Sequence, residues 1–233
     1  MTIRRALLAL LLSLLVAPAA AGAAAWAPYD RPAQYGAVTD DDVPIAMRDG
    51  VVLRADVQRP DAPGRYPVVV IQTPYNKDGG INTVLGGQAS YFVQRGYVVV
   101  TVDVRGTGSS QGTWDSFGEA EQRDGYEVVE WAARQPWSSG RVGLYGPSYM
   151  GLNQLYTAAL RPPSLKAIFP IVPMADGYRD IVFSGGDVNV SFIPLWLGLV
   201  TATGLTPPAY ATDGTLQGLA DGLSTLAAHL GGA

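Results

Sequence analysis

The chain has 233 residues, of which 48% are hydrophobic and 15% charged, so it can bury a sizeable core and is not a disordered protein. Its formal net charge of −4 provides no basic surface for a phosphate backbone, so we expect no nucleic-acid partner. The chain contains no cysteine and one histidine, His229, which excludes a zinc site of cysteine and histidine and leaves one candidate for an imidazole base.

Residues 1–25 have the pattern of a secretory signal peptide. Arg4 and Arg5 precede an apolar run over residues 6–16, and small residues then offer an A-x-A cleavage site before Trp26. The apolar run is shorter than the roughly 20 residues that a membrane-spanning helix needs. We therefore expect a secreted or periplasmic protein with no stable membrane insertion after signal removal. A retained membrane anchor is the alternative.

Strand patterns begin after a polar segment, residues 26–42, which ends in three aspartates. Residues 51–58 alternate between apolar and polar side chains after the turn pair Asp49-Gly50, which predicts a hairpin whose other arm is residues 43–47. Four short apolar runs follow. Their β-branched content without alternation is typical of strands covered on both faces, and they are residues 68–71, 97–102, 141–145 and 166–172.

Two segments between these runs have helical spacing. The first has charged residues opposite its apolar stripe, including an expected i,i+4 pair of Glu130 and Arg134, and the second stops at Pro162-Pro163. The apolar stripes are Gly125, Val128, Val129 and Ala132 in the first segment, and Leu152, Leu155, Tyr156 and Ala159 in the second. The alternation of strands and helices predicts an α/β domain with a mainly parallel sheet.

The pattern changes after residue 173. Residues 188–212 are uncharged and hydrophobic but are interrupted by Pro194, Gly198, Gly204 and the pair Pro207-Pro208. These breaks favour packed cap or core helices over a transmembrane helix, although a lipid-facing protein is a third class that this segment and the amino-terminal run leave open. Residues 216–233 end without a strand pattern.

Ser148 lies between a predicted strand and a predicted helix, in the run Gly146-Pro147-Ser148-Tyr149-Met150-Gly151. This is the context of a nucleophile elbow, whose sharp turn lifts a serine hydroxyl above the sheet and needs small neighbours. The usual pattern G-x-S-x-G is not kept, because Met150 stands where the second glycine would be. A simple helix N-cap is the alternative for a serine at this position.

Four motifs in chain order resemble those of the cocaine esterase / X-Pro dipeptidyl-peptidase branch (CocE/NonD family) of α/β-hydrolases. They are Met47-Arg48-Asp49-Gly50-Val51, Thr73-Pro74-Tyr75-Asn76-Lys77, the segment from Asp103 to Gly112, and Gly146 to Gly151. The resemblance implies an α/β-hydrolase fold, incomplete in this chain, with the start of a helical cap. Together with the signal-peptide pattern, it divides the chain into a signal peptide (1–25), the amino-terminal part of the hydrolase domain (26–173) and the start of the cap with a tail (174–233).

The same resemblance implies the site residues. Ser148 would be the nucleophile that forms an acyl-enzyme, Tyr149 would supply a backbone N–H to the oxyanion hole, and Tyr75 would supply its phenol O–H. Asp103-Val104-Arg105-Gly106 would be a structural loop beside the site. Gly106, Gly108 and Gly112 lack the G-x-G-x-x-G spacing, so we expect no nucleotide site, and we expect no metal or other cofactor.

The acid and the base of a catalytic triad follow the serine in α/β-hydrolases. The candidate base after Ser148 is His229, in a predicted cap or tail helix, and the resemblance implies an acid and a histidine on later strands that this sequence lacks. The candidate acids are Asp176, Asp180, Asp187, Asp213 and Asp221. We therefore expect a serine hydrolase of small-molecule esters or X-Pro peptides whose chain is truncated. The alternative is a catalytically inactive binding module with the same fold.

Overall fold

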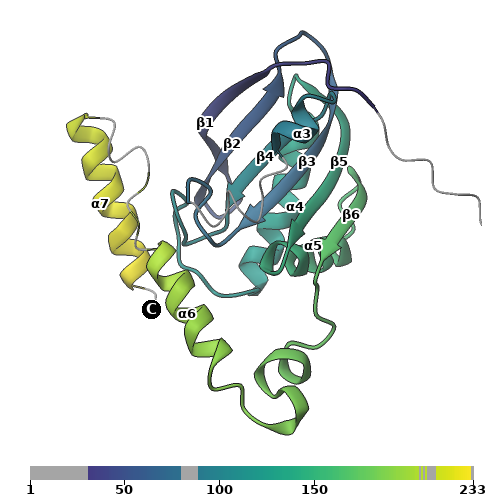
Figure 1. The fold of residues 1–233 in the computed structure, drawn as a ribbon. Helices are drawn as coiled ribbons and strands as arrows, with labels where there is room; N and C mark the ends of the chain where they lie inside the picture. The colour runs from purple at the N-terminus through teal and green to yellow at the C-terminus, as the bar shows by residue number, and fades with distance from the viewer. Residues whose placement is uncertain (1–30, 80–88, 205, 207, 209–213, 232–233) are drawn as a thin grey trace, which may run out of the picture. The chain divides into compact units, whose positions relative to one another are not determined.

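The computed structural model describes residues 31–79, 89–204, 206, 208 and 214–231. Within these residues one sheet has six strands in the order β1-β2-β4-β3-β5-β6 (Figure 1). The strands are β1 (Ala37–Ala46), β2 (Val52–Pro60), β3 (Tyr66–Thr73), β4 (Val98–Asp103), β5 (Ser138–Pro147) and β6 (Leu165–Ile171). Strands β4, β3, β5 and β6 are parallel to one another, whereas β1 pairs antiparallel with β2, and β2 antiparallel with β4. The predicted α/β fold with a mainly parallel sheet is confirmed.

Helices pack on both faces of the sheet. Val68 and Val70 of β3 face α4 (Glu119–Arg134), and the intervening Val69 faces the opposite side, where Val93 of the short helix α3 (Ala89–Val93) packs. This alternation follows from the two-residue period of a strand, which sends successive side chains to opposite faces. Helix α5 (Tyr149–Ala159) lies beside α4 and contacts β5 and β6.

The predicted apolar stripe of α4 is confirmed, since Gly125, Val128, Val129 and Ala132 are all buried. The predicted ion pair of Glu130 with Arg134 is wrong, because both Glu130 carboxylate oxygens accept hydrogen bonds from the backbone N–H and hydroxyl of Ser164. Glu130 thereby ties α4 to the turn before β6.

The predicted stripe of α5 is partly wrong. Leu152 is buried, but Leu155 is 38% exposed, and the buried face instead includes the polar Asn153, Gln154 and Thr157. Asn153 donates to the Gln72 carbonyl, and Gln154 bonds the backbone of Phe169 through its side-chain amide. Hydrogen bonds to strand backbone make the burial of these amides possible.

Two further strand predictions need correction. Strand β1 begins at Ala37, within the segment expected to be a polar lead-in, and has a bulge between Asp40 and Val43 where Asp42 takes a φ of 51°. Strand β6 is not covered on both faces, since Phe169 is 62% exposed. In the described residues β6 is the last strand of the sheet, so no further strand packs beside it.

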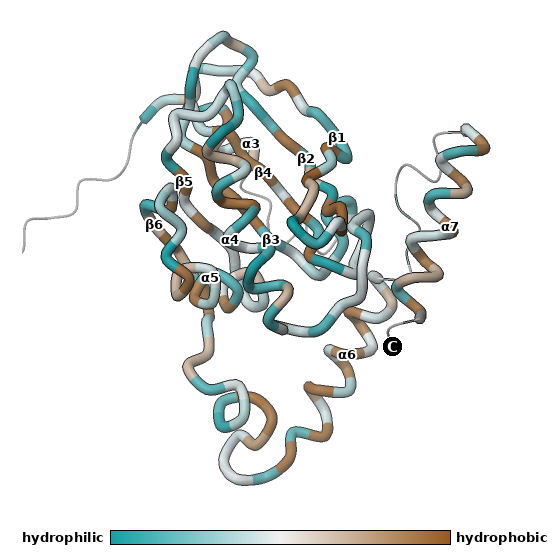
Figure 2. The backbone as a smooth tube through the Cα atoms, turned by 180° about the vertical axis from the view of Figure 1, so that it is seen from behind, coloured by the Kyte–Doolittle hydropathy of each residue, from teal (hydrophilic) through white to brown (hydrophobic). Residues whose placement is uncertain are grey.

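Helical elements follow β6: a π-helical turn η1 (Tyr178–Val182), a 3₁₀ turn η2 (Ser184–Gly186), α6 (Phe192–Gly204) and α7 (Leu216–Gly231). Hydrophobic positions recur along β4 and again on α6 and α7 (Figure 2). Among the described residues, none of the helices has both the length and the apolar character needed to cross a membrane. The predicted signal peptide lies outside the described residues.

Candidate active site

Ser148 is the single residue between β5 and α5, and its backbone has φ 56° and ψ −125°. A non-glycine residue adopts such a conformation only where its surroundings enforce it, at a cost of about 1–3 kcal/mol. Here the Ser148 N–H donates to the Ile171 carbonyl at 3.0 Å, and the Ser148 carbonyl accepts from Gly151 and Leu152 in the first turn of α5.

Gly146 and Gly151 flank Ser148, and neighbouring atoms lie too close to both glycines for a side chain to fit. A Cβ on Gly146 would lie 2.5 Å from the Met150 Cβ, and one on Gly151 would lie 2.8 Å from the Ile171 carbonyl oxygen. Met150 itself is fully buried in the core. The departure from the usual motif is therefore explained, because in this turn the small residue is needed at 151 and position 150 has room for a large side chain.

Ser148 occupies the N-cap position of α5, as the alternative expects, but its side chain makes no capping hydrogen bond to the helix. The Ser148 Oγ instead lies 3.5 Å from the phenol oxygen of Tyr75, which is in the loop after β3. Tyr149 begins α5, so its N–H is among the first four of the helix, which have no acceptor within the helix. The structure thus brings Ser148, Tyr75 and the Tyr149 backbone together.

Tyr75 is 3% exposed, and its oxygen also accepts a hydrogen bond of 3.3 Å from the indole N–H of Trp196 on α6. A phenol has one O–H to donate. Because Trp196 uses an acceptor position of the oxygen, the O–H remains able to donate toward Ser148. The sequence does not reveal this role of Trp196, since the hydrogen bond depends on how α6 packs.

The side chain of Tyr149 is anchored below the turn. Its O–H donates to Glu121 Oε2 at 2.6 Å, and its oxygen accepts from the indole N–H of Trp114 and the backbone N–H of Phe117. Burial, followed by the charge of Glu121, raises the pKa of Tyr149 well above 10.0, and burial raises the pKa of Glu121 to about 7. Sequence reasoning missed Glu121, because an acid in the first turn of a helix has an ordinary dipole role.

A cavity of about 210 Å³ adjoins Ser148. The Phe117 ring stacks on Tyr149 with a centroid distance of 4.0 Å, and the Trp196 ring lies on Tyr149 at 6.2 Å. The lining is otherwise mostly aliphatic or aromatic and includes Leu152, Met174, Ile181, Val182, Phe192 and Ile193. Such a lining suits a small apolar group.

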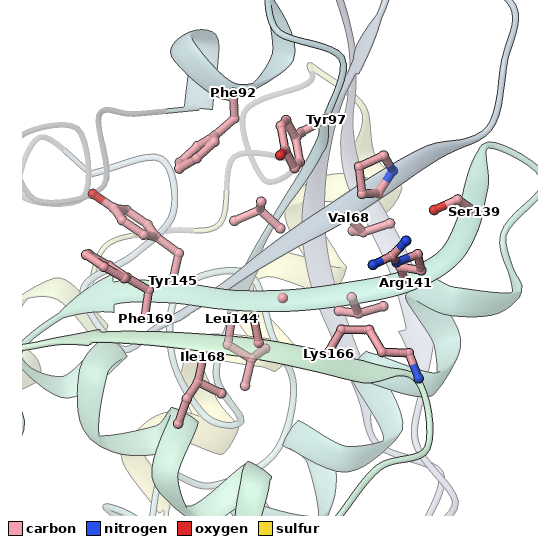
Figure 3. A pocket seen from close by; sticks show the side chains of 15 residues that line it. Val68, Phe92, Tyr97, Ser139, Arg141, Leu144, Tyr145, Lys166, Ile168 and Phe169 are labelled. Atoms are coloured by element: carbon pink, nitrogen blue, oxygen red, sulfur yellow. The ribbon is translucent and has the colours of Figure 1, made fainter. Parts of the chain in front are cut away.

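A larger cavity of about 850 Å³ lies elsewhere, over β3, β5 and β6 (Figure 3). The Tyr145 and Phe169 rings stack there at 6.0 Å, with Phe92 and Tyr97 nearby and Arg141 and Lys166 at the other end. Ser148 does not line this larger cavity. Ser148 and its strained turn line the cavity of about 210 Å³ instead. The smaller cavity is therefore the candidate active site, and the larger one is an open face of the sheet.

His229 lies in α7, and both of its ring nitrogens face carbonyl oxygens. Nε2 is 2.8 Å from the Ser110 oxygen and Nδ1 is 3.1 Å from the Gly204 oxygen, so this ring is not directed at Ser148. Of the candidate acids, Asp180 and Asp187 are exposed. Asp176 is half-buried and accepts from the backbone N–H groups of Tyr178 and Arg179, and Asp221 accepts from Gln217 on the same helix. Asp213 lies outside the described residues.

The loop after β4 is organised around Asp103, which is fully buried. Its carboxylate accepts from the N–H groups of Lys77 and Ser109, and burial raises its pKa to about 7. Arg105 binds Asp124 of α4 and Asp49 of the β1–β2 turn. The glycine-rich motif therefore folds around its own carboxylate. In the part of the chain that the structure describes, no group of three or more acidic or histidine residues is arranged to hold a metal ion.

A serine on a strained strand-to-helix turn, above a mainly parallel sheet, defines the class as α/β-hydrolase. The sequence pattern of the X-Pro dipeptidyl-peptidases (S15 family) matches residues 49–221, and the chain belongs to this family. Cocaine esterase from Rhodococcus sp. (strain MB1 Bresler) is 36% identical over 179 residues, a match that covers 74% of this chain and 31% of the esterase.

Solved structures agree with this assignment. A CocE/NonD family hydrolase from Staphylococcus aureus superposes with a TM-score of 0.66 at 33% identity, covering 72% of this chain and 34% of that chain. An α-amino acid ester hydrolase superposes with a TM-score of 0.56 at 26% identity, covering 72% of this chain and 30% of the other. The chain thus spans about a third of the length of these relatives. Members of the family are serine esterases or peptidases.

Proposed function

We propose that this protein is a serine hydrolase that cleaves ester bonds or X-Pro amide bonds through an acyl-enzyme on Ser148. The observation that carries the proposal is the strained Ser148 backbone, with a hydroxyl that lies 3.5 Å from the Tyr75 phenol and makes no capping hydrogen bond to α5. Strain of this kind is typical of active sites. Membership of a family of esterases and X-Pro peptidases supports the same reaction.

In the proposed reaction the Ser148 oxygen attacks the substrate carbonyl carbon and gives its proton to a general base. The carbonyl oxygen becomes an oxyanion that accepts hydrogen bonds from the Tyr75 O–H and the Tyr149 N–H. The intermediate then collapses, the base returns the proton to the leaving alcohol or amine, and the acyl group remains on Ser148. Water attacks the acyl-enzyme by the same route and releases the acid.

We propose that the group bound in the 210 Å³ cavity is small and apolar, either an acyl substituent or a proline ring. The support is the lining, in which aromatic rings from Phe117, Tyr149 and Trp196 surround the space next to Ser148. Apolar groups gain about 25 cal/mol for each Å² removed from water, so such a group would contribute directly to binding.

We also propose that the general base and its acid come from polypeptide outside this sequence. His229 is engaged with two carbonyl oxygens, and the chain spans about a third of its relatives. The division into residues 1–25, 26–173 and 174–233, with export directed by the first of these, remains part of the proposal. The described strands end at Ile171 and helices follow, which fits a cap that begins near residue 174.

A fluorophosphonate probe tests the proposal on the full native polypeptide. We expect covalent labelling at Ser148 that Ser148→Ala abolishes, while the control Ser139→Ala, in the larger cavity, labels normally. Labelling that persists in Ser148→Ala would refute the proposal. A native protein that is inert to the probe would support the alternative, a catalytically inactive binding module with this fold.

A further inference from the structure

Lys77 is the centre of a buried polar network near the site that the proposed reaction does not use. The Lys77 side chain is fully buried, and its Nζ lies 2.9 Å from Asp42, 2.8 Å from Asp56 and 2.9 Å from Asp78. All three contacts are ion pairs, and the one with Asp78 is also a hydrogen bond. Burial lowers the pKa of Lys77, but the bonds to Asp56, Asp42 and Asp78 outweigh it and raise that pKa, so the lysine stays charged.

This network joins segments that are distant in sequence. Asp42 is at the bulge of β1, Asp56 is in β2, and Asp42 also donates its N–H to the Asp56 carboxylate at 3.0 Å. The Lys77 backbone N–H donates to Asp103 at the end of β4, at 2.6 Å. Lys77 is therefore held by contacts to β1, β2 and β4, although a lysine side chain is among the most flexible in an unfolded chain.

Tyr75 lies between two anchored residues of its loop, Lys77 on one side and Thr73 on the other. On one side its N–H donates to the Thr73 hydroxyl at the end of β3, and on the other Asn76 has a φ of 63° before Lys77. A left-handed residue such as Asn76 is retained when bonds on either side fix it. Contacts on both sides therefore hold this loop, and in this arrangement the Tyr75 oxygen is 3.5 Å from Ser148 Oγ.

From this arrangement we infer that Lys77 is a positioning residue, whose bonds to Asp42, Asp56 and Asp78 hold the Tyr75 hydroxyl at the oxyanion position. The inference rests on the proposed function. Misplacement of a catalytic group by about 1 Å can cost about 10²-fold in rate, so an anchor two residues from the donor has a direct effect on catalysis. A lysine that only joined β1 to β2 would act on stability and not through Tyr75.

A double-mutant cycle on the full native polypeptide separates these roles, with the rate of fluorophosphonate labelling at Ser148 as the readout. We expect Lys77→Met to slow labelling at least about tenfold in the native background and less than about twofold in a Tyr75→Phe background. Equal slowing in both backgrounds would overturn the inference. Arg59→Met is the matched control, because the ion pair of Arg59 with Asp40 also joins β1 to β2 but lies away from Tyr75. We expect an unchanged labelling rate in this variant.

Two additions keep the test decisive. Lys77→Met leaves three carboxylates without their cation and can prevent folding. In that case Asp56→Asn, which keeps the shape of the side chain, is expected to slow labelling about threefold with native Tyr75 and not at all with Tyr75→Phe; equal slowing in both would overturn the inference.

If the native protein does not label, the proposed function fails, and the positioning role is tested by ¹⁹F NMR with 3-fluorotyrosine at position 75. We then expect one sharp resonance in the native protein and in Arg59→Met, and a shifted or broadened resonance in Asp56→Asn. An unchanged resonance in Asp56→Asn would overturn the inference.

Discussion

At the scale of single residues, the sequence predicts the roles of some residues of the site but not of others. The strand and helix patterns around Ser148 predict its turn, and Gly146 and Gly151 have the small size that close backbone contacts require. The role of Glu121 is not predictable, because its contact with Tyr149 joins residues 28 positions apart and depends on how α4 packs against the turn.

Tyr75→Phe tests the oxyanion donor. Removal of one such donor costs about 2.7–4 kcal/mol of transition-state stabilisation, so we expect kcat for an activated ester to fall about 10²–10³-fold. The melting temperature should change little, since the two hydrogen bonds of the phenol are long, at 3.3 and 3.5 Å. Tyr145→Phe, at the larger cavity, serves as the control. A Tyr75→Phe protein with native kcat would exclude a catalytic role for the phenol.

Glu121→Gln tests the buried carboxylate through the pH dependence of stability. Burial raises the pKa of Glu121 from 4.5 to about 7, so the folded protein binds more protons than the unfolded one between these values. The free energy of unfolding therefore loses up to about 3 kcal/mol from this group as the pH rises from about 4.5 to about 7.

In Glu121→Gln that loss is expected to be absent. Denaturant titrations should therefore show that the free energy of unfolding of the variant rises relative to that of the native protein across the same pH range. Glu119→Gln, an exposed position in the same first turn of α4, is the control and should follow the native protein. Parallel pH profiles for Glu121→Gln and the native protein would contradict the assigned burial of the charge.

At the scale of elements, α4 follows its sequence pattern and α5 does not. The apolar stripe of α4 meets the sheet directly, whereas α5 buries Asn153 and Gln154, whose amides satisfy backbone groups of β3 and β6. A hydrophobic period cannot reveal this face, because its hydrogen-bond partners come from other strands. The exposure of Phe169 on β6 could not be predicted either, because a run of apolar residues has the same pattern in a covered and in an uncovered strand.

Gly125→Ala tests the contact between α4 and α5. A Cβ at Gly125 would overlap the Thr157 Oγ1, so we expect a loss of about 1–3 kcal/mol in the free energy of unfolding, measured with denaturant. Gly198→Ala in α6 is the matched control, because nothing lies within 4 Å of its Cβ and the change should be neutral or stabilising by up to about 1 kcal/mol. A Thr157→Ala change should recover part of the loss; full additivity of the two changes would argue against the contact.

At the scale of the whole molecule, the alternating elements predict a mainly parallel sheet but not its strand order. The order β1-β2-β4-β3-β5-β6 places Ser148 next to the loop of Tyr75, because β5 and β3 are neighbours although residues 75 and 148 are far apart in sequence. That the acid and base are missing from this sequence stays a prediction, and His229, the candidate base, contacts the Gly204 and Ser110 carbonyl oxygens.

Phe169→Asp tests whether further polypeptide covers the open face of the sheet. If that face is covered in the full native polypeptide, the buried charge should lower its free energy of unfolding by about 2 kcal/mol or more. Lys166→Asp, at the exposed end of the same strand, is the control and should have a small effect. A neutral Phe169→Asp would mean that the face stays open, and would remove one support for a longer hydrolase domain.

The account depends most directly on acyl transfer to Ser148. The measurement is mass spectrometry of the full native polypeptide quenched during turnover of an activated ester, with the modified peptide sequenced. We predict one acyl group on Ser148, lost on further incubation and absent from Ser148→Ala. Ester turnover with no acyl group on Ser148, or with the same adduct in Ser148→Ala, would contradict the account.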